Sequence, residues 1–145
     1  MDDVRGLSGL ELLRAMIAAG ERPGIAVSLD FDLVEADDGR AVFAGTPGPH
    51  VYSPLGMAHG GYAATLLDSA CGCAVHTRLA ASQSYSTLEL KVAYHKAITS
   101  AVGRLRAEAR VVTLGRRVAF SEGTLKDAGG TLYASATSTL LITER

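Results

Sequence analysis

The sequence is short of cysteine, of net charge and of long apolar runs, and each shortage excludes a class of protein. The 145 residues include two cysteines, and the formal net charge at pH 7 is −1. Without a run of lysine or arginine, the chain is not expected to bind nucleic acid. No apolar stretch has the length needed to span a bilayer, so no membrane partner is expected either.

The two cysteines, Cys71 and Cys73, are separated by a single residue. Side chains two positions apart on a helix point to different sides, so a disulfide between them is not expected. No other cysteine or suitably spaced histidine completes a metal site. Residues 1–13 lack a basic region followed by an apolar one, so they do not form a secretory signal. We expect two reduced thiols, no metal and a cytoplasmic location.

What the chain does contain suits one globular domain. Hydrophobic residues make up 48% of the sequence and charged residues 20%, which is the balance of a soluble protein. The length suits one hydrophobic core, so residues 1–145 are expected to form a single domain.

The first third of the chain predicts a short helix followed by a hairpin. Ser8 and Glu11 match a capping box, apolar residues then repeat at helical spacing, and Gly20 is a plausible stop. From Ile25 to Leu33 apolar residues alternate with smaller or polar ones, which predicts a half-buried strand. A turn at residues 37–39 leads to a second strand over 40–45.

The remainder predicts one long helix and several strands. Residues 46–56 are rich in proline and glycine and predict a loop without regular structure. The segment from about Gly60 to Leu79 is rich in alanine and leucine and is long enough for a helix of about five turns. Strand-like alternation follows over residues 87–94, 105–111, 116–127 and 131–142, with a turn at 127–130.

These elements predict an α+β protein. An antiparallel sheet with one apolar face needs a cover, and the long helix is apolar on nearly every side, so it must be enclosed. An antiparallel sheet of five to six strands wrapped around one long central helix, with a short N-terminal helix, satisfies both needs. This arrangement is called a hotdog fold.

Asp68 is the unusual residue of the long helix. From Gly60 to Thr77 there is no other acidic or basic side chain except His76, apart from the weakly acidic thiols and the Tyr62 phenol. Burying an unpaired carboxylate costs several kcal/mol, so an idle aspartate is not expected here. Asp68 is therefore either a hydrogen-bonded anchor or a group kept for chemistry.

Gly60 and Gly61 stand at the head of the same helix, where backbone N–H groups lack helical partners. Such a terminus can bind an anion or a developing oxyanion, although two glycines can also simply mark a turn into the helix. Asp68 follows Gly61 by seven residues, on nearly the same face but about 10 Å further along the axis. If the two groups share one carbonyl, they must come from two copies with antiparallel helices across a two-fold axis.

Three further features have two interpretations each. His59 either caps the helix or takes part in the chemistry at its head. Arg116 and Arg117, after Gly115, either hold phosphate groups or are simply solvated. Gly72 costs about 1 kcal/mol relative to alanine in mid-helix, which would make sense if a neighbouring backbone packs closely there.

The segment "SPLGMAHGGYAATLLDSACGCA", residues 53–74, resembles the signature of hotdog-fold acyl-CoA thioesterases of the phenylacetic-acid-pathway (PaaI) type. That pattern reads roughly Asn-Pro-x-Gly-x-x-His-Gly-Gly, with an acidic residue seven positions after the second glycine. The resemblance continues through "STLELKVAYHKAI" and "GRLRAEARVVTLGRRVAF" and covers nearly the whole chain.

The resemblance implies hydrolysis of an aryl- or alkyl-acyl-CoA to the free acid and coenzyme A, without a metal or other cofactor. In such enzymes the amide of the second glycine binds the thioester oxygen, and the acidic residue is a general base or a nucleophile. The resemblance also implies a homodimer at least, and a dimer of dimers. The residues implied are, for catalysis, Asp68, Gly61, His59 and Ser53 and, for substrate binding, Gly60, Thr87, Arg116 and Arg117.

One position departs from the pattern. Ser53 stands where the motif begins with asparagine, and a serine hydroxyl has a shorter reach than an amide. This departure keeps open a second interpretation, a hotdog protein that binds acyl-CoA as a sensor or carrier without hydrolysing it. A hydratase of the same fold is less favoured, because its usual Asp/His pair at the head of the helix is absent.

Overall fold

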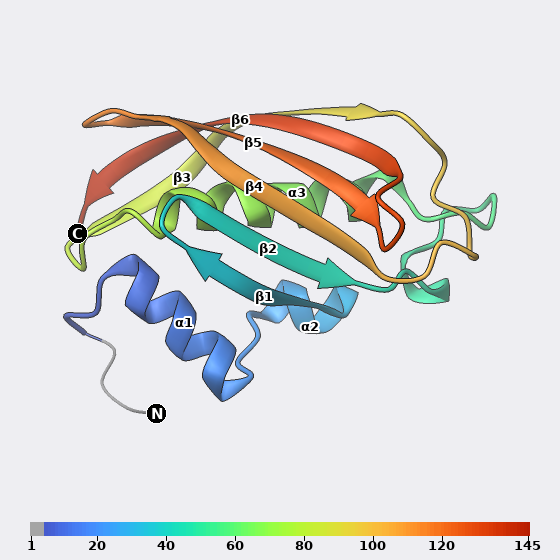
Figure 1. The fold of residues 1–145 in the computed structure, drawn as a ribbon, viewed down its shortest axis with the longest axis horizontal. Helices are drawn as coiled ribbons and strands as arrows, with labels where there is room; N and C mark the ends of the chain where they lie inside the picture. Colours follow the sequence, from blue (N-terminus) through green and yellow to red (C-terminus); the bar gives the residue numbers. More distant parts are fainter. Residues whose placement is uncertain (1–4) are drawn as a thin grey trace.

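The structure is a computed structural model that describes residues 5–145. Its helices and strands follow one another along the chain in the order of the labels in Figure 1. They are α1 (Gly9–Ala19), α2 (Gly24–Leu29), β1 (Phe31–Asp37), β2 (Arg40–Gly45), the 3₁₀ turn η1 (Pro49–Val51), α3 (Gly60–His76), β3 (Gln83–Tyr94), β4 (Leu105–Leu114), β5 (Val118–Asp127) and β6 (Leu132–Glu144).

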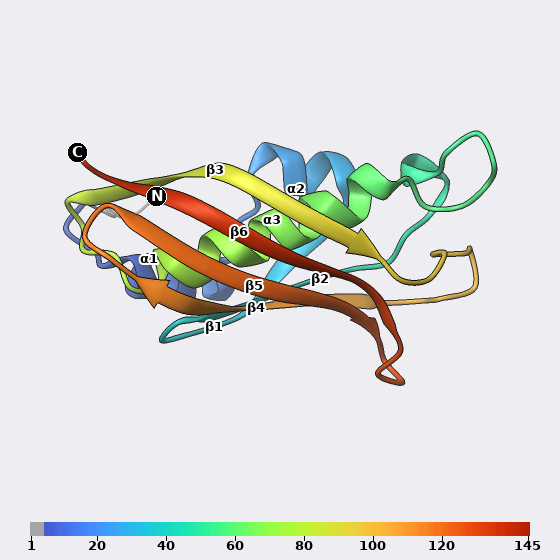
Figure 2. The same ribbon diagram turned by 90° about the horizontal axis from the view of Figure 1, so that it is seen from above.

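The six strands form one antiparallel sheet in the order β1-β2-β4-β5-β6-β3. The sheet curves over α3, which runs along its inner face (Figures 1 and 2). The predicted hotdog arrangement is therefore confirmed, with six strands. Two strands, β1 and β3, are the edges of the sheet, and β3 is the one that reaches the candidate site.

The predicted first helix is confirmed at both ends. Ser8 and Glu11 form the reciprocal capping box, and Gly20 ends α1 in the left-handed conformation at φ 68°. The helix begins against the end of α3, where a Cβ on Gly9 would lie 1.8 Å from the carbonyl oxygen of His76. The sequence pattern located α1, but its docking on α3 depends on this missing side chain.

The strand predicted from Ile25 to Leu33 is wrong in its first half, where the chain forms α2 instead. Pro23 occupies the N-cap position, and Asp30 ends the helix in the left-handed conformation at φ 58°. The alternating apolar residues of this stretch do not line the core, since Ile25 is 52% and Val27 is 59% exposed. Turn residues at both ends, rather than the period-two pattern, determine the structure of this segment.

Two other boundaries differ from the prediction. The loop expected over residues 46–56 contains the single turn η1, which starts at a proline whose fixed φ suits a helical turn. The long helix ends at His76 rather than near Leu79. The hydroxyl of Thr77 donates to the carbonyl of Ala74 at 2.6 Å and accepts from the amide of Gly39 at 2.8 Å, which ties the end of α3 to the β1–β2 turn.

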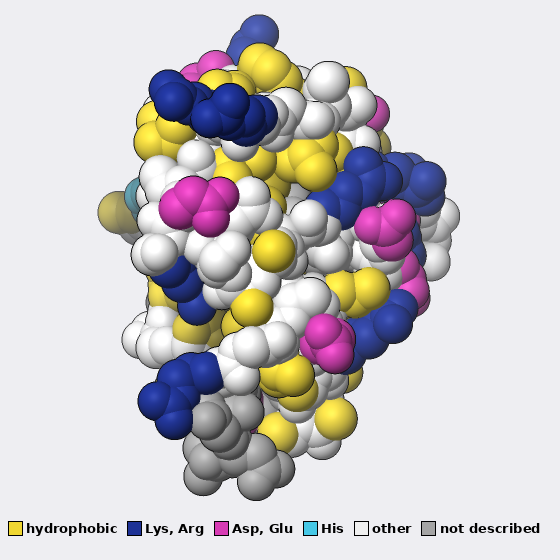
Figure 3. Space-filling model, turned by 90° about the vertical axis from the view of Figure 1, so that its left-hand side faces the viewer, with side chains coloured by type: hydrophobic (Ala, Val, Ile, Leu, Met, Phe, Trp, Pro, Cys, Tyr) yellow, Lys and Arg dark blue, Asp and Glu magenta, His cyan; other side chains and the backbone are white. Residues whose placement is uncertain are grey.

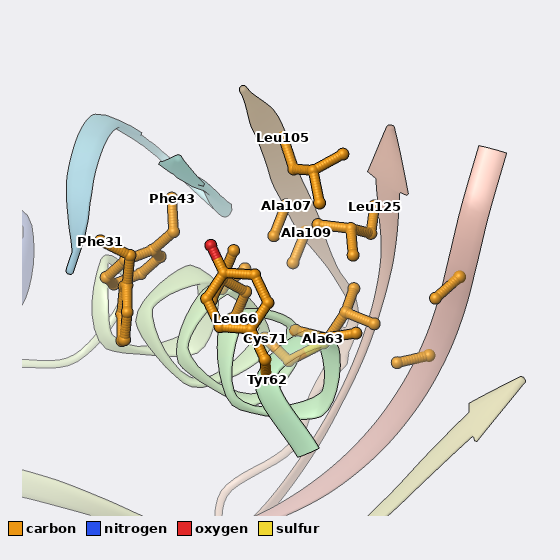
Figure 4. Packing of buried hydrophobic residues seen from close by; sticks show 14 of the residues in the cluster. Phe31, Phe43, Tyr62, Ala63, Leu66, Cys71, Leu105, Ala107, Ala109 and Leu125 are labelled. Atoms are coloured by element: carbon orange, nitrogen blue, oxygen red, sulfur yellow. The ribbon is translucent and has the colours of Figure 1, made fainter. Parts of the chain in front are cut away.

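The core lies between α3 and the inner face of the sheet, as Figure 4 shows from close by. Helix α3 contributes several small side chains together with Tyr62 and leucines, and the strands contribute Phe31, Phe43 and further aliphatic side chains. The labelled members are Phe31, Phe43, Tyr62, Ala63, Leu66, Cys71, Leu105, Ala107, Ala109 and Leu125. Small residues on α3 allow the sheet to approach the helix closely.

Helix α3 is less enclosed than the sequence predicts. One stripe along it is half-buried or exposed, and this stripe consists of Gly61, Ala64, Thr65, Asp68 and Ser69. The sheet of one protomer covers the rest of the helix but leaves the stripe open beside β3. The prediction that α3 is enclosed on every side is therefore not met by the residues that the structure describes.

Both cysteines are free, as predicted. Cys71 is buried and Cys73 is half-buried on α3. Burial raises the pKa of the Cys71 thiol to about 11 and that of Cys73 to about 12. Both side chains are therefore protonated at neutral pH and pack as small apolar groups.

Candidate functional site

Asp68 lies at mid-length of α3 on the open stripe, and its carboxylate has a partner on the neighbouring edge strand. The hydroxyl of Thr87 in β3 donates to the Asp68 Oδ1 atom at 2.9 Å. This side chain is half-buried, so its carboxylate keeps access to the open side of the helix. The structure thus brings together the predicted acid and the predicted hydroxyl residue, and leaves the acid accessible.

The predicted oxyanion donor, the amide of Gly61 at the head of α3, is hydrogen-bonded to a neighbouring side chain. Nδ1 of the His59 side chain accepts a hydrogen bond from the amide of Gly61 at 2.8 Å, with His59 at the N-cap position. The capping interpretation of His59 is therefore confirmed in this conformation. The Gly61 amide points away from the helix toward an acceptor, which is the geometry that an oxyanion site requires.

Two residues that the sequence analysis did not single out hold the same turn of the helix. The hydroxyl of Tyr94, at the end of β3, donates to the carbonyl of Gly60 at 2.6 Å. The hydroxyl of Thr65 donates to the carbonyl of Gly61 at 2.8 Å. Strand alternation could place Tyr94 on the inner face of β3, but only the packing of β3 on α3 shows which residue it meets.

A pocket of about 340 Å³ opens beside this turn. It is lined by Leu29, His50, Val51, Tyr52, His59, Gly61, Tyr62 and Thr65. The lining is mostly apolar with a few polar groups, which suits a small organic ligand. Burial and the negative charge of Asp30 raise the pKa of the Tyr62 phenol to about 12, so this wall of the pocket is uncharged at neutral pH.

Ser53 lies in the turn that precedes α3, and its contacts are local. Its side-chain oxygen accepts from the amide of Leu55 at 3.3 Å, and its own amide donates to the carbonyl of Met57 at 2.7 Å. The structure therefore gives Ser53 a role in shaping the turn. It does not bring the Ser53 hydroxyl into a hydrogen bond with His59, Gly61 or Asp68.

The head of the helix and Asp68 are separate positions within one protomer. Asp68 follows Gly61 by seven residues of α-helix, which corresponds to about 10 Å along the axis. The predicted catalytic residues His59 and Gly61 thus lie at one position, and the predicted catalytic Asp68, with the predicted substrate-binding Thr87, lies at another. A substrate carbonyl bound at one group of a protomer is out of reach of the other group of the same protomer.

Arg116 and Arg117 lie in the turn between β4 and β5, and both are exposed. Within the described residues, six other arginines form ion pairs with carboxylates, whereas these two have no carboxylate within 4.0 Å. The turn lies at the left-hand end of the molecule in Figure 1. Figure 3, which faces that end, shows Lys and Arg side chains at its upper edge next to hydrophobic ones.

No group of three or more His, Cys, Asp or Glu side chains in residues 5–145 is arranged to hold a metal ion. Over the same residues, no helix combines the length and the apolar character that crossing a membrane requires. The candidate site therefore consists of backbone amides, hydroxyl groups, an imidazole and one carboxylate.

A sheet wrapped around a central helix, with a capped amide at the helix head and a carboxylate on the open stripe, defines a hotdog protein. The profile of the thioesterase superfamily matches residues 55–134, which include the head of α3, Asp68 and Thr87. The chain belongs to the thioesterase superfamily. This membership supports thioester hydrolysis as the general activity.

Solved structures support the same assignment. A phenylacetic acid degradation-related protein of Ralstonia eutropha is 26% identical with a TM-score of 0.79, and the match covers 89% of this chain and 98% of that one. A thioesterase family protein of Silicibacter pomeroyi is 24% identical with a TM-score of 0.80, over 92% of this chain and 96% of that one. The resemblance stated from the sequence is thereby confirmed. A search of curated proteins finds no match.

Proposed function

We propose that the protein hydrolyses an aryl- or alkyl-acyl-CoA thioester. Water adds to the thioester carbonyl, the carbon–sulfur bond breaks, and the products are the free acid and the thiol of coenzyme A. Asp68 activates the water as a general base, or attacks the carbonyl itself to form an anhydride that water then opens. The Gly61 amide stabilises the negative charge that develops on the carbonyl oxygen.

One observation carries this proposal. The Asp68 carboxylate lies on the open stripe of α3, held by Thr87 at 2.9 Å, in a helix that has no other acidic side chain. A carboxylate with one hydrogen bond keeps free lone pairs for a water molecule or a carbonyl carbon. A purely structural anchor would be expected to have its acceptor capacity satisfied inside the fold.

We propose that the complete site forms between two copies of the chain. β3 is an unpaired edge strand with exposed apolar side chains, Leu88 at 57% and Tyr94 at 54%. Such an edge favours pairing with another strand, and a two-fold axis makes the two β3 strands and the two α3 helices antiparallel. Asp68 of one protomer would then face the Gly61 amide of its partner. The proposed assembly is a homodimer at least, with two equivalent sites.

His59 has a defined part in this proposal. Its Nδ1 atom marks where an acceptor lies relative to the Gly61 amide, 2.8 Å from the nitrogen. The carbonyl oxygen of the substrate takes that position when the imidazole turns aside. The imidazole thus keeps the amide satisfied until the thioester arrives.

Arg116 and Arg117 are proposed to hold the phosphate groups of coenzyme A. Both guanidinium groups are exposed and free of carboxylate partners within the described chain. Guanidinium groups bind phosphate with paired hydrogen bonds, and each such pair is stronger than a neutral hydrogen bond. We also propose a cytoplasmic location, since both cysteines are free thiols and the substrate class is intracellular.

A second candidate function is binding of acyl-CoA without hydrolysis. Two observations favour it: the Gly61 amide is already satisfied by His59, and the Ser53 hydroxyl is engaged within its own turn. A protein that only senses or carries the thioester needs neither an open oxyanion site nor an oriented water.

The test is release of coenzyme A from a panel of aryl- and alkyl-acyl thioesters, measured together with calorimetric binding of the same compounds. We expect the wild-type protein to release coenzyme A and the Asp68→Asn and Asp68→Ala variants to lose at least about 10²-fold in kcat with the fold retained. Glu21→Gln, which removes an exposed charge at the end of α1, is the control and is expected to retain full activity. Tight binding without release from any thioester would instead establish the second candidate.

A further inference from the structure

One peptide unit at the head of α3 is held from both sides. Its N–H belongs to Gly61 and donates to Nδ1 of His59 at 2.8 Å. Its C=O belongs to Gly60 and accepts from the hydroxyl of Tyr94 at 2.6 Å. Because the peptide is planar, fixing the carbonyl also fixes the direction of the N–H.

Glycine at position 60 lets the Tyr94 phenol approach closely. A Cβ built on Gly60 would lie 3.1 Å from the Tyr94 hydroxyl oxygen and 3.2 Å from the ring carbon that bears it. Few real Cβ atoms have neighbours this close, so a residue with a Cβ would require the phenol to shift by a few tenths of an ångström. The glycine at this position is therefore explained by an approach of the phenol, in addition to any freedom that it gives a ligand.

The phenol reaches Gly60 from the edge strand. Leu90 and Val92 of β3 pack against the core cluster, and Tyr94 follows them on the same face of the strand. Tyr94 is 54% exposed, and together with Gly60, His95 and Lys96 it lines a second pocket of about 310 Å³ at the head of α3. Burial of the ring therefore does not explain its position. The hydrogen bond from the Tyr94 hydroxyl links β3 to the carbonyl of Gly60.

We infer that Tyr94 is a positioning residue for the oxyanion site, an inference that rests on the proposed thioester hydrolysis. A hydrogen bond to the carbonyl draws electron density from the peptide nitrogen and makes the N–H a stronger donor. The effect grows as negative charge develops on the substrate oxygen, so it favours the transition state over the bound thioester. Tyr94 also keeps the first turn of α3 from fraying, which fixes the direction of the amide.

The inference predicts a split between kinetic constants. Tyr94→Phe keeps the ring and removes the hydroxyl that donates to Gly60. We expect kcat to fall roughly 10-fold with KM changed less than about 3-fold, because loss of one oxyanion donor costs 10²–10³-fold and an indirect effect should be smaller. Tyr133→Phe is the matched control, since the hydroxyl of Tyr133 donates to Asp127 at 2.9 Å, whereas that of Tyr94 donates to Gly60. The control is expected to retain the wild-type kcat.

A spectroscopic measurement tests the polarisation itself. The Asp68→Asn variant is loaded with a thioester that carries ¹³C at the carbonyl, and the carbonyl stretch is recorded by isotope-edited infrared difference spectroscopy. Binding to the Gly61 amide should lower the frequency, and adding Tyr94→Phe should return it part of the way to the value in water. Tyr133→Phe should leave it unchanged.

The outcomes separate this inference from the proposed function. An unchanged kcat and an unchanged carbonyl frequency in Tyr94→Phe would overturn the role of Tyr94 while hydrolysis by the wild-type protein stands. A fall in kcat without a frequency change would also count against it, since the phenol would then act through general folding. If the wild-type protein releases coenzyme A from no thioester, the proposed function fails first, before Tyr94 is tested.

Discussion

The hydroxyl of Thr87 donates a hydrogen bond of 2.9 Å to the carboxylate of Asp68 and so joins the edge strand β3 to the middle of α3. Thr87 precedes an irregularity in the β3–β6 register, between Thr87 and Glu89, where Leu88 is the extra residue. Bulges of this kind redirect side chains near active sites. The edge strand thus presents a donor to the one acidic residue of the helix.

Replacing Thr87 tests whether this bond orients Asp68 for catalysis. Thr87→Val keeps the shape of the side chain but removes the donor, so the carboxylate can turn away from its productive position. We expect kcat to fall about 10-fold or more, since a hydrogen bond to a charged group contributes about 1.5–3 kcal/mol and about 1.4 kcal/mol corresponds to a factor of ten. Thr87→Ser restores a hydroxyl and should recover most of the activity in a steady-state coenzyme A release assay. Equal activity in the Val and Ser variants would contradict the orienting role.

The role proposed for the two exposed arginines predicts a substrate-dependent effect. Arg116→Ala combined with Arg117→Ala should raise KM for acyl-CoA by about 10-fold or more, because phosphate contacts are lost. The same variant should hydrolyse the N-acetylcysteamine thioester of that acyl group as the wild-type protein does, since this compound has no phosphate. Arg78→Ala, at an exposed ion pair with Asp38, serves as the control. An equal loss on both substrates would show that the arginines act on folding or assembly instead.

Local signals in the sequence predicted those elements that local chemistry determines. The capping box at Ser8 and the left-handed glycine at position 20 located α1 correctly. The alternation that began at Ile25 failed because its first apolar side chains face outward and the helix α2 occupies the segment. Periodicity cannot distinguish a strand from one and a half turns of helix over six residues.

The part of the candidate site that lies within residues 53–74 could be predicted from the sequence. Asp68 and Gly61 could be found from composition and helix geometry. The Gly61 amide bonds to a residue only two positions away, whereas the bond of Asp68 to Thr87 depends on how β3 packs on α3. The cap of His59 on the Gly61 amide was one of two interpretations of the sequence, whereas the bond from Tyr94 to Gly60 has no sequence signal of its own. Both arise where a strand or a loop meets the first turn of α3.

The acid sensitivity of the fold should depend on His76. Burial and the positive charge of Arg145 lower the pKa of His76 below its ordinary value of 6.5. The unfolded chain therefore binds a proton at a pH at which the folded chain does not, so stability is full above about pH 6.5 and falls as the pH drops below it. We expect the free energy of unfolding, from urea titrations at pH 7.5 down to about pH 5, to decline in this window.

Two variants isolate this contribution. His76→Gln removes the titrating group and should flatten the decline between about pH 6.5 and 5. Arg145→Gln removes a charge that lowers the pKa and should make the decline shallower without abolishing it. The fold also lowers the pKa values of some carboxylates, Glu108 among them, from ordinary values of 4.5 or below. Their effect on stability therefore falls at a lower pH than that of His76. An unchanged slope in His76→Gln would contradict the assignment.

Gly72 is retained in mid-helix because of a side chain, whereas the sequence interpretation expected a neighbouring backbone. A Cβ at this position would lie 2.8 Å from the Cε2 atom of Tyr85, whose ring is packed between β3 and α3. Alanine is favoured over glycine in a helix by about 1 kcal/mol, but the overpacking here costs about 1–3 kcal/mol. We therefore expect Gly72→Ala to lower the free energy of unfolding by about 1 kcal/mol. In a Tyr85→Leu background, where the ring is gone, the same change should become neutral or stabilising, and a double-mutant cycle in urea measures the difference. If Gly72→Ala stabilises the wild-type protein, the ring is not what keeps glycine at this position.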